Sequence, residues 1–487
     1  MNRIEHVCTI RQGEGMMMRS PSLRILVALS ILTLSAHCQT VPVAFVDVNV
    51  VPMDREAVLA HQTVLVKDGK IAAVGPISSV TIPRDAQRID GRNRYLMPGL
   101  ADMHMHFMRP LSNRASDKAA RHGSVGSESP NFAEENPALA LLFVANGVTS
   151  VRNTWGDPAI LAFGKEIEAG KALGPHIYSS GPVTDGSPPE WHGSRSVANA
   201  EQAREAVQED KQAGYIAIKV YDGLSKDAYE DIVADALKVD LPVIGHVPDA
   251  VGMSGVLAAH QYPVEHIEYP LIAILSDKVK QPPSDADLVK YPDLTKLPDL
   301  AQKMKAAGTW FCPTLVAYRI PRTDTAWLEQ EKFVPPAILA RYQKAYAPAS
   351  GQPVIYALDS SEAQPIYLAI VGALHKGGVK LLLGTDAHKP SALSGFSIHE
   401  ELADFVAAGL TPYEAIRSGT SDAARFLHRE TEFGTVAVGL RADLILLNAN
   451  PLEDVGNVQK REGVMVQGNW LTEDVLRSKL EKLSQDH

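Results

Sequence analysis

The sequence predicts an α/β protein: a (β/α)8 TIM barrel with a small β-sandwich domain formed from both ends of the chain. Two observations lead to this fold class. Eight apolar, strand-like runs alternate with helical patterns through the middle of the chain, and short runs of alternating apolar and polar residues occupy both flanks. We expect the sandwich in residues 38–97 with 428–475, the barrel in residues 98–427, and a charged tail in residues 476–487.

The predicted barrel strands are apolar runs that end in polar residues or glycine. They cover residues 96–106, 148–153, 176–181, 216–222, 241–247, 264–269, 309–318 and 379–388. Helical patterns such as those of residues 200–214, 225–239 and 399–409 separate them. The active site of such a barrel lies at the carboxyl ends of the strands, so the polar residues found there are the functional candidates. Residues 271–308 and 319–364 exceed a normal loop and are candidates for a lid.

The flanking runs predict the second domain. Residues 41–90 contain alternating runs that indicate short antiparallel strands, with a hairpin turn at Asp68 and Gly69. A similar β-rich pattern returns in residues 433–451 and 463–471. The two patches therefore predict one small sheet domain built from both ends of the chain.

Composition excludes several classes of protein. Of the 487 residues, 45% are hydrophobic and 21% are charged, which is typical of an ordinary globular protein. The net charge of −10 provides no basic footprint for nucleic acid, so we expect no nucleic-acid partner and leave a homo-oligomer open. Three cysteines, Cys8, Cys38 and Cys312, are too few for a disulfide scaffold or a zinc ribbon. Any metal site must then consist of His, Asp, Glu or Lys.

The N-terminal segment resembles a signal peptide. Basic Arg19 and Arg24 precede an apolar run over residues 25–34, and two small residues follow it. We interpret residues 1–17 as an upstream extension and residues 18–37 as the signal peptide, which predicts a periplasmic or secreted protein. A lipoprotein anchored at Cys38 is disfavoured because His37 stands where a small residue is expected. No apolar run reaches the ~20 residues of a membrane span.

Five potential metal ligands fall at the predicted carboxyl ends of barrel strands. His104 and His106 are one residue apart at the end of the first strand, so both side chains share one face. His246 ends the fifth strand, His266 lies on the sixth, and Asp386 ends the eighth. One such histidine alone would most simply be a structural residue. Histidines with purely structural roles have no reason to collect at these ends, and the set therefore predicts a metal site.

Lys219 lies within the apolar run of the fourth strand. An ammonium group is unfavourable to bury without a partner. A neutral lysine can add carbon dioxide, and the resulting carbamate can bridge two metal ions. The alternative is a lysine whose ammonium reaches solvent at the end of the strand.

Together these motifs resemble the amidohydrolase superfamily of metal-dependent hydrolases. The resemblance rests on PGLADMHMH, IKVY, the GH of strand five, the EH of strand six, GTDA and GLRADLILLNANPLED. It covers nearly the whole chain after the signal peptide. More narrowly, the sequence is similar to the branch that contains Xaa-Pro dipeptidases (prolidases), other aminoacyl-cleaving carboxypeptidases and imidazolonepropionase-related enzymes.

The resemblance implies a role for each motif residue. His104 and His106 would hold the more buried of two divalent metal ions, His246 and His266 the second, Lys219 as N6-carboxylysine would bridge them, and Asp386 would bind the first ion and transfer protons. Nitrogen and oxygen ligands without cysteine fit zinc best, with manganese, cobalt or iron as alternatives. Deaminases of the superfamily carry a glutamate three residues after the strand-five histidine. The residue here is Asp249, which puts deamination in doubt.

We therefore predict an exported binuclear amidohydrolase that cleaves dipeptides of the Xaa-Pro type or N-acyl amino acids, with hydroxide as nucleophile and Asp386 as proton acceptor. Hydrolysis of cyclic amides, lactones or other esters is the alternative, and a metal- or substrate-binding protein is a remote one. Four residues are candidates for substrate binding: Tyr221, Arg152 and Tyr318 for a carboxylate, and His192 for the oxyanion. Hydrogen-bonded residues of the wall or loops are the simpler explanation for each of the four.

Overall fold

The structure is a computed structural model that describes residues 41–114, 118–121, 127–279, 284–319, 324–345, 358, 361–387 and 389–485. The expected signal peptide and Cys38 lie outside these residues. The same holds for parts of the two long stretches that we considered as a lid.

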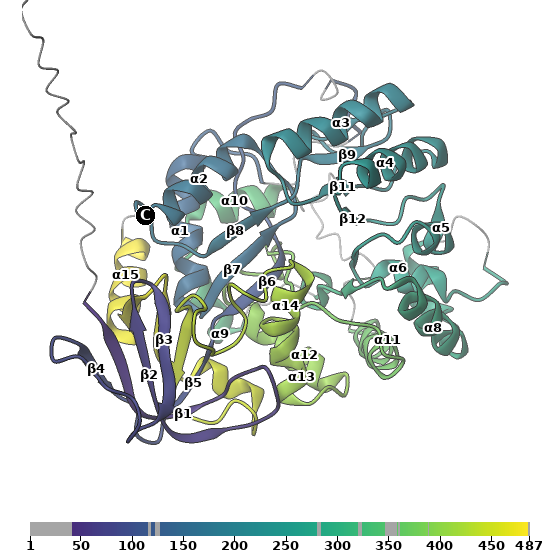
Figure 1. Ribbon diagram of the computed structural model, residues 1–487. Coiled ribbons are helices and arrows are strands. Elements are labelled where there is room, and N and C mark those ends of the chain that lie inside the picture. Colours follow the sequence, from purple (N-terminus) through teal and green to yellow (C-terminus); the bar gives the residue numbers. More distant parts are fainter. Residues whose placement is uncertain are drawn as a thin grey trace, which may run out of the picture. The chain divides into compact units, whose positions relative to one another are not determined.

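A barrel of parallel strands forms the larger part of the described chain (Figure 1). Its strands are β6 (Leu100–Met105), β7 (Val148–Asn153), β8 (His176–Ser179), β11 (Ile218–Val220), β12 (Val243–Gly245), β13 (Val264–Glu265) and β14 (Phe311–Cys312). Neighbouring strands pair in parallel as β6-β7-β8 and as β11-β12-β13-β14. The order of these strands follows the chain, as the sequence predicted.

Backbone hydrogen bonds close the two sheets into one barrel. On one side, the Gly181 N–H donates to the Ala217 carbonyl at 2.9 Å. On the other, the Leu382 N–H donates to the Phe311 carbonyl at 2.9 Å, and the Asp386 N–H donates to the His104 carbonyl at 2.7 Å. The eighth predicted strand thus closes the barrel through single bridges instead of a continuous ladder. The predicted (β/α)8 barrel is confirmed.

Two short strands appear that the sequence did not predict, and several predicted strands are shorter than expected. β9 (Val183–Asp185) pairs with β11 and with β10 (Arg195–Ser196). Of the run 264–269, only β13 is a strand, and a helix begins at Glu268. Of the run 309–318, only β14 is a strand, and Leu315–Tyr318 is a 3-10 helix. Thr314 turns the chain between them with a positive φ of 51°, which a strand residue does not adopt.

Helices separate the barrel strands. They are α1 (Phe132–Ala145), α2 (Pro158–Glu168), α3 (Ala200–Ala213), α4 (Lys226–Lys238), α5 (Gly252–Ala258), α6 (Glu268–Ala273), α7 (Asp285–Lys290), α8 (Leu297–Ala307), α9 (Thr325–Glu331), α10 (Pro336–Ala345), α11 (Gln364–Lys376), α12 (Ile398–Ala407), α13 (Pro412–Ser418) and α14 (Ser421–Phe426). The expected helices at 200–214, 225–239 and 399–409 correspond to α3, α4 and α12. Capping explains the start of α3 and α4, because the side chains of Asn199 and Ser225 accept hydrogen bonds from backbone N–H groups of the first turn.

The small domain contains one sheet from both ends of the chain. Its strands are β1 (Val43–Val50), β2 (Leu59–Lys67), β3 (Lys70–Pro76), β4 (Gln87–Asp90), β5 (Tyr95–Pro98), β15 (Leu444–Leu447), β16 (Arg461–Val466) and β17 (Asn469–Thr472), in the order β17-β16-β15-β5-β1-β2-β3 with β4 beside β1. The expected hairpin is present, since Asp68 and Gly69 join β2 to β3 with φ values of 49° and 73°. We expected only antiparallel pairs, but β4 and β5 run parallel to β1 because residues 77–86 carry the chain back before β4 begins.

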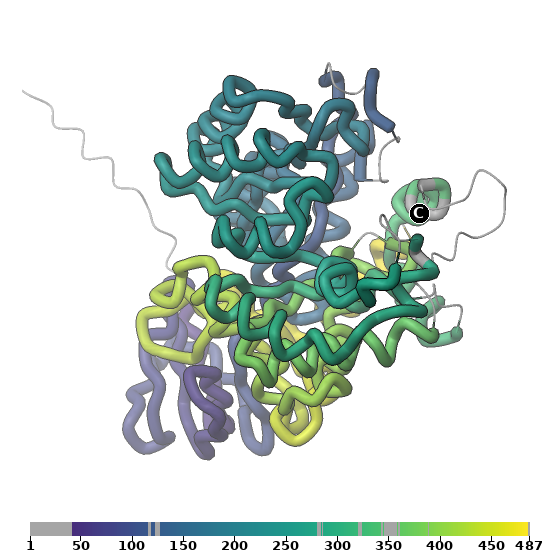
Figure 2. The backbone as a smooth tube through the Cα atoms, turned by 90° about the vertical axis from the view of Figure 1, so that its right-hand side faces the viewer, coloured from purple at the N-terminus to yellow at the C-terminus, as the bar shows by residue number. Residues whose placement is uncertain are grey.

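The sheet curls around a core of its own. Phe45 of β1 and Trp470 of β17 meet edge to face with ring centroids 5.2 Å apart, although three strands separate β1 from β17 in the sheet. Buried residues from both ends of the chain, including Val64, Leu444 and Met465, complete this core. In both views the purple N-terminal strands and the yellow-green C-terminal segment lie together (Figure 1, Figure 2). The prediction of a sandwich domain formed from both chain ends is confirmed.

The C-terminal segment is a helix. Residues that we expected only as a charged tail belong to α15 (Glu473–Gln485). Leu476 is buried there against Val464 and Val466 of β16 and Val144 of α1. Burial of this apolar side chain explains why the segment folds onto the protein. Among the described residues, no helix combines the length and the apolar character needed to cross a membrane.

A cluster of charges with two buried members, His176 and Asp443, joins the barrel to the small domain. His176, at the start of β8, has its Nδ1 2.5 Å from a Glu168 oxygen and its Nε2 3.2 Å from a carboxylate oxygen of Asp443. Arg441 lies on the other side of Asp443, with its Nε 3.1 Å from the same oxygen. Burial alone would lower the pKa of His176, but Asp443 and Glu168 outweigh it and raise this pKa to about 9.

This cluster predicts a pH-dependent contribution to stability. Because the pKa of His176 rises on folding, protonated His176 stabilises the protein fully below pH ~6.5, and this contribution disappears as the pH rises towards 9. The stability lost in His176→Gln should therefore be about 3 kcal/mol larger at pH 6 than at pH 9.5. Urea unfolding at several pH values measures it, with exposed His260→Gln as control. A difference between wild type and His176→Gln that does not change with pH would contradict the prediction.

Candidate active site

The five ligands expected from the sequence converge at the carboxyl ends of the barrel strands. The ring centroids of His104 and His106 are 5.4 Å apart, those of His104 and His266 are 4.6 Å apart, and those of His246 and His266 are 4.8 Å apart. Asp386 joins the group, with its Oδ1 2.9 Å from Nε2 of His106 and 3.5 Å from Nε2 of His104. Residues up to 282 positions apart in the sequence thus form one cluster, and all but the partly buried His106 are buried.

Lys219 lies beneath the histidines and stays inside the protein. It is 2% exposed, and its Nζ has no hydrogen-bond partner among the described residues. A Cβ at Gly245, on the neighbouring strand, would lie 2.9 Å from Cδ of Lys219 and 2.4 Å from the Val220 carbonyl oxygen. Glycine at this position therefore makes room for the lysine. The alternative of an ammonium that reaches solvent does not describe this side chain.

Unusual backbone conformations accompany the ligands. His266 and Asp386 have positive φ values of 66° and 52°, which non-glycine residues rarely adopt. Backbone hydrogen bonds hold both residues in place, one from the His266 N–H to the Cys312 carbonyl and one from the Asp386 N–H to the His104 carbonyl. Such strained residues often occur where a side chain must be aimed at a functional site.

Three of the imidazoles have a partner that the sequence did not reveal. Nδ1 of His104 lies 2.8 Å from an oxygen of Glu265, Nδ1 of His246 lies 3.0 Å from Asp222, and Nδ1 of His266 lies 2.9 Å from the Thr314 hydroxyl. Each contact fixes the orientation of one ring. The only signals in the sequence are that Asp222 ends the predicted strand 216–222 and that Glu265 directly precedes His266.

The electrostatics favour neutral imidazoles. Burial, followed by repulsion from nearby positive charges, lowers the pKa of His104, His106 and His266, and it lowers the pKa of His246 to about 3. Burial also lowers the pKa of Lys219, and Arg152 acts in the same direction. Burial opposes ionisation of Asp386, but Lys389 and His106 hold its pKa well below the usual range. Neutral imidazoles and an ionised carboxylate are the forms in which these residues bind metals.

This group of residues fits a metal site. One donor atom each from His104, His266 and Asp386 lies within 4.8 Å of the others. Nε2 of His104 is buried and has no hydrogen-bond partner among the described residues, and the same is true of the Lys219 Nζ. Buried donors without a partner are unfavourable unless something else binds them. A divalent cation held by nitrogen and oxygen ligands would satisfy the lone pair of the His104 nitrogen.

Two of the four candidate substrate residues border the cluster. Tyr221 stacks on the ring of His246 with centroids 3.9 Å apart, and its hydroxyl accepts a hydrogen bond from Trp191 at 2.9 Å. Tyr318 lies 6.2 Å from His266, measured between ring centroids. His192 is further out, on a loop where its Nδ1 lies 2.9 Å from a Glu128 oxygen.

Arg152 does not lie where a substrate carboxylate could reach it easily. Its side chain is fully buried; its Nε donates to the Met103 carbonyl at 2.5 Å, and its Nη2 is 2.9 Å from a Glu265 oxygen. From the sequence we expected Arg152 to bind the carboxylate of the substrate, because this arginine lies at the end of the second strand. In the structure the buried carboxylate of Glu265 binds the guanidinium instead.

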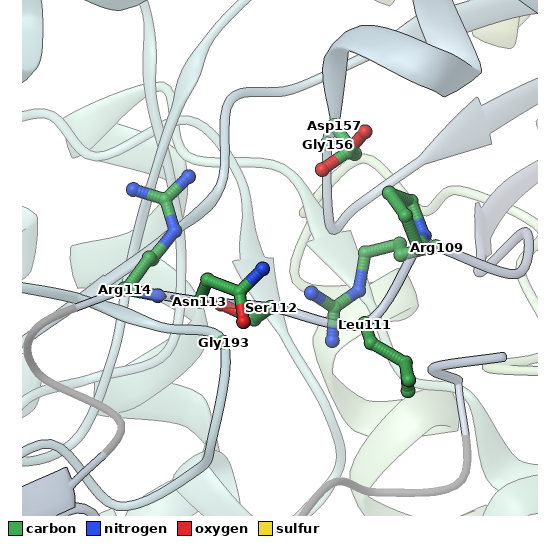
Figure 3. Close-up of a pocket in the computed structure, with 9 residues that line it drawn as sticks. Arg109, Leu111, Ser112, Asn113, Arg114, Gly156, Asp157 and Gly193 are labelled. Atoms are coloured by element: carbon green, nitrogen blue, oxygen red, sulfur yellow. Dashed lines mark hydrogen bonds between the residues drawn. The ribbon is translucent and has the colours of Figure 1, made fainter. Parts of the chain in front are cut away.

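A cavity of about 260 Å³ lies beside the cluster (Figure 3). Its wall includes Arg109, Asn113, Arg114 and Asp157, and in the view of Figure 3 Asn113 lies between the two arginines. The Arg109 guanidinium stacks over Trp155 at 4.1 Å, and the Trp155 ring lies 6.4 Å from that of His106. Polar groups of the loop after β6 therefore line space close to the metal ligands.

Comparisons with known proteins agree with this architecture. Ochratoxinase from Aspergillus niger is 25% identical over 466 residues, which covers 85% of this chain and 82% of the relative. Imidazolonepropionase from Maricaulis maris is 25% identical over 446 residues, 86% of this chain and 95% of the relative. The fold is shared with a Xaa-Pro dipeptidase crystallised with methionine in its active site, at a TM-score of 0.63, 19% identity and coverage of 88% of this chain and 100% of the other.

The crystal structure of A. niger ochratoxinase has a TM-score of 0.60 to this chain at 22% identity, covering 89% of this chain and 96% of the other. At these identities the solved structures support the fold alone. The model of the Amidohydrolase family matches residues 95–471, which is most of the chain. This chain therefore belongs to the amidohydrolase family and is a hydrolase of that family.

Proposed function

We propose that the protein is an exported binuclear metallohydrolase that cleaves dipeptides of the Xaa-Pro type or N-acyl amino acids. One observation carries the proposal: four neutral histidines, Asp386 and an unpartnered buried Lys219 meet at the carboxyl ends of the barrel strands. This arrangement provides more ligands than one ion needs, and it leaves a buried amine that a bridging carbamate would explain.

Each ligand has an assigned place in the proposal. His104, His106 and Asp386 would hold one divalent ion, His246 and His266 would hold the other, and Lys219 as a carbamate would link the two. Zinc fits this donor set best because no cysteine is assigned to it. When bound, such ions supply the positive charge that makes water nucleophilic near neutral pH and polarises a carbonyl group.

Asp386 is the residue that we assign to proton transfer. It is ionised, and its two oxygens lie 2.9 Å from His106 and 3.0 Å from the Lys389 Nζ. A carboxylate at this position can accept the proton of the attacking water and pass it to the leaving amine. Tyr221, Tyr318 and His192 would contact the substrate from the strand ends and from the loop after β9.

The relatives support amide substrates and also an alternative. The names Xaa-Pro dipeptidase and ochratoxinase describe proteins with this fold, whereas imidazolonepropionase is the relative that favours a cyclic amide. Lactones and other esters belong to the same alternative. Asp249, at the position of the deaminase glutamate, is exposed, which gives no support to deamination.

Export is proposed from residues 18–37 alone, whose sequence resembles a signal peptide. It predicts a periplasmic or secreted mature protein. N-terminal sequencing of the protein recovered from the periplasm or medium tests the proposal. An N-terminus that still includes residues 18–37 would count against it.

Asp386→Asn separates catalysis from metal storage. Because asparagine cannot take up the proton, turnover should fall by about 10²–10⁴-fold while both metal ions stay bound. Metal content by mass spectrometry and amine release by a colorimetric assay measure the two effects, with exposed Asp299→Asn as control. Unchanged turnover in Asp386→Asn would remove this residue from the mechanism and favour a binding or storage protein.

Lys219→Ala tests the carbamate. Without the bridging group, about one of the two ions should be lost, and a short carboxylate such as acetate in bicarbonate-free buffer should partly restore both metal and activity. Lys219→Met, which keeps the volume of the side chain, serves as the matched variant for packing. Full metal content and full rate in both variants would eliminate the carbamate.

Substrate polarity is tested with dipeptides and N-acyl amino acids, each compared with its C-terminally blocked form. If the Tyr221 hydroxyl contacts the free carboxylate, Tyr221→Phe should lower kcat/KM for free acids by roughly 10- to 150-fold and spare the blocked forms. An equal loss on both would mean that Tyr221 only shapes the site. If wild type releases no amine from either set, the cyclic-amide and ester alternative takes precedence.

A further inference from the structure

We propose that Glu265 and Arg152 are positioning residues that hold His104 in the one ring orientation and tautomer that can bind a metal ion. The inference rests on the proposed metal site. Neither residue is a metal ligand in that proposal, and the sequence suggested a different role for Arg152.

The contact between Glu265 and His104 determines where the imidazole proton resides. Nδ1 of His104 lies 2.8 Å from Oε2 of Glu265, and both side chains are buried, with at most 1% exposure. Because a carboxylate can only accept, Nδ1 carries the proton and donates it to Glu265. The lone pair is then on Nε2, which faces Asp386 and has no hydrogen-bond partner among the described residues. This is the tautomer that a metal ion requires.

Arg152 connects Glu265 back to the strand that carries His104. Its Nη2 lies 2.9 Å from Oε1 of Glu265 and donates to Oε2 at 3.1 Å. Its Nε donates to the carbonyl of Met103, the residue directly before His104. The contacts therefore connect β6, β13 and β7 in a closed ring of hydrogen bonds. The guanidinium also lies 5.1 Å from the ring centroid of Phe426.

Stability alone does not account for this ring of hydrogen bonds. A fully buried ion pair often adds little stability compared with apolar residues of the same volume, because both charges must leave water. Buried Asp210 pairs with the partly buried Arg195 at 2.8 Å elsewhere in the barrel, and no histidine contact is found for Asp210 among the described residues. What distinguishes Glu265 is that its carboxylate also accepts from a ring whose other nitrogen faces the cluster.

A rival explanation treats Glu265 as a metal ligand. Donor atoms of His104, Glu265 and Cys312 also lie within 4.8 Å of one another. In that arrangement, however, Nδ1 of His104 already donates to Glu265, and Arg152 engages the same carboxylate. The two roles of Glu265 predict different results. If Glu265 is a ligand, removal of its oxygens removes an ion. If it positions His104, its removal lowers the affinity for an ion that still binds at saturation.

The test is a cobalt titration of the full chain against a competing chelator, with the visible absorption of bound Co²⁺ as the signal. Glu265→Gln and Arg152→Met should each lower the affinity for one of the two ions by about 10- to 100-fold, and each variant should still bind two ions at saturation. Arg152→Met introduced into Glu265→Gln should add little further loss, because Arg152 acts through Glu265.

The double variant Arg152→Met/Glu265→Leu keeps the test decisive if the single variants do not fold. It removes both buried charges together, so the fold should survive. It should still show the weakened ion, because Nδ1 of His104 has lost its acceptor. Asp210→Asn is the matched control, for which we expect a lower Tm and unchanged cobalt affinity.

The outcomes separate this inference from the proposed function. Wild-type cobalt affinity in the double variant would overturn the positioning role while leaving the binuclear site intact. Loss of a whole ion at saturation in Arg152→Met/Glu265→Leu, which has no side-chain oxygen at position 265, would overturn it in favour of ligation. A wild-type chain that binds no cobalt would overturn the proposed function itself, and the positioning role with it.

Discussion

The free-energy penalty for burying ionisable groups is the constraint on which the site depends. Lys219, four imidazoles and Asp386 lie at the ends of short barrel strands, where few of their polar atoms reach water. Such groups persist only if they become neutral, pair with each other or bind a ligand. The histidines become neutral, and Asp386 pairs with His106 and Lys389. Lys219 has no hydrogen-bond partner among the described residues. The unmatched lysine is the strongest indication in the structure that another chemical group belongs in the site.

The surrounding fold serves to fix these groups. The carbonyl of His104 receives the backbone N–H of Asp386, so the hydrogen bonds that close the barrel also bring two proposed ligands of one ion together. At the other end of β6, the Gly99 N–H donates to the Asp443 carbonyl of the small domain, and Asp443 also pairs with His176 of β8. The small domain thereby contacts the base of the strands whose opposite ends carry the site. Closure of the barrel and assembly of the site are in this respect the same structural event.

The elements and residues marked by a periodic pattern or by a strand end could be predicted from the sequence, whereas those defined by contacts between distant residues could not. The run 148–153 predicted β7 without error because three of its six residues, Val148, Thr149 and Val151, are β-branched and the run lies between clear turn signals. His104, His106, His246, His266 and Asp386 were predictable because the position at a strand end is itself the signal. Glu265 was not, since its partners His104 and Arg152 are 161 and 113 residues away. Helix α15 was missed although Leu476, Leu480 and Leu483 recur at helical spacing, because the charged residues between them were interpreted as a solvated tail.

Arg152 shows why residue type and strand position do not suffice to assign a role. A guanidinium can bind the carboxylate of a substrate or of the protein with the same geometry, and the sequence does not show which carboxylate lies nearer. In the structure Glu265 is nearer, and both groups are fully buried. Tyr221 follows β11 and stacks on His246, whereas Trp191 and His192 lie on the loop after β9. In the proposed function, metal binding therefore depends on buried strand ends whose partners lie inside the barrel, and substrate contacts depend on residues of the strand ends and loops around them.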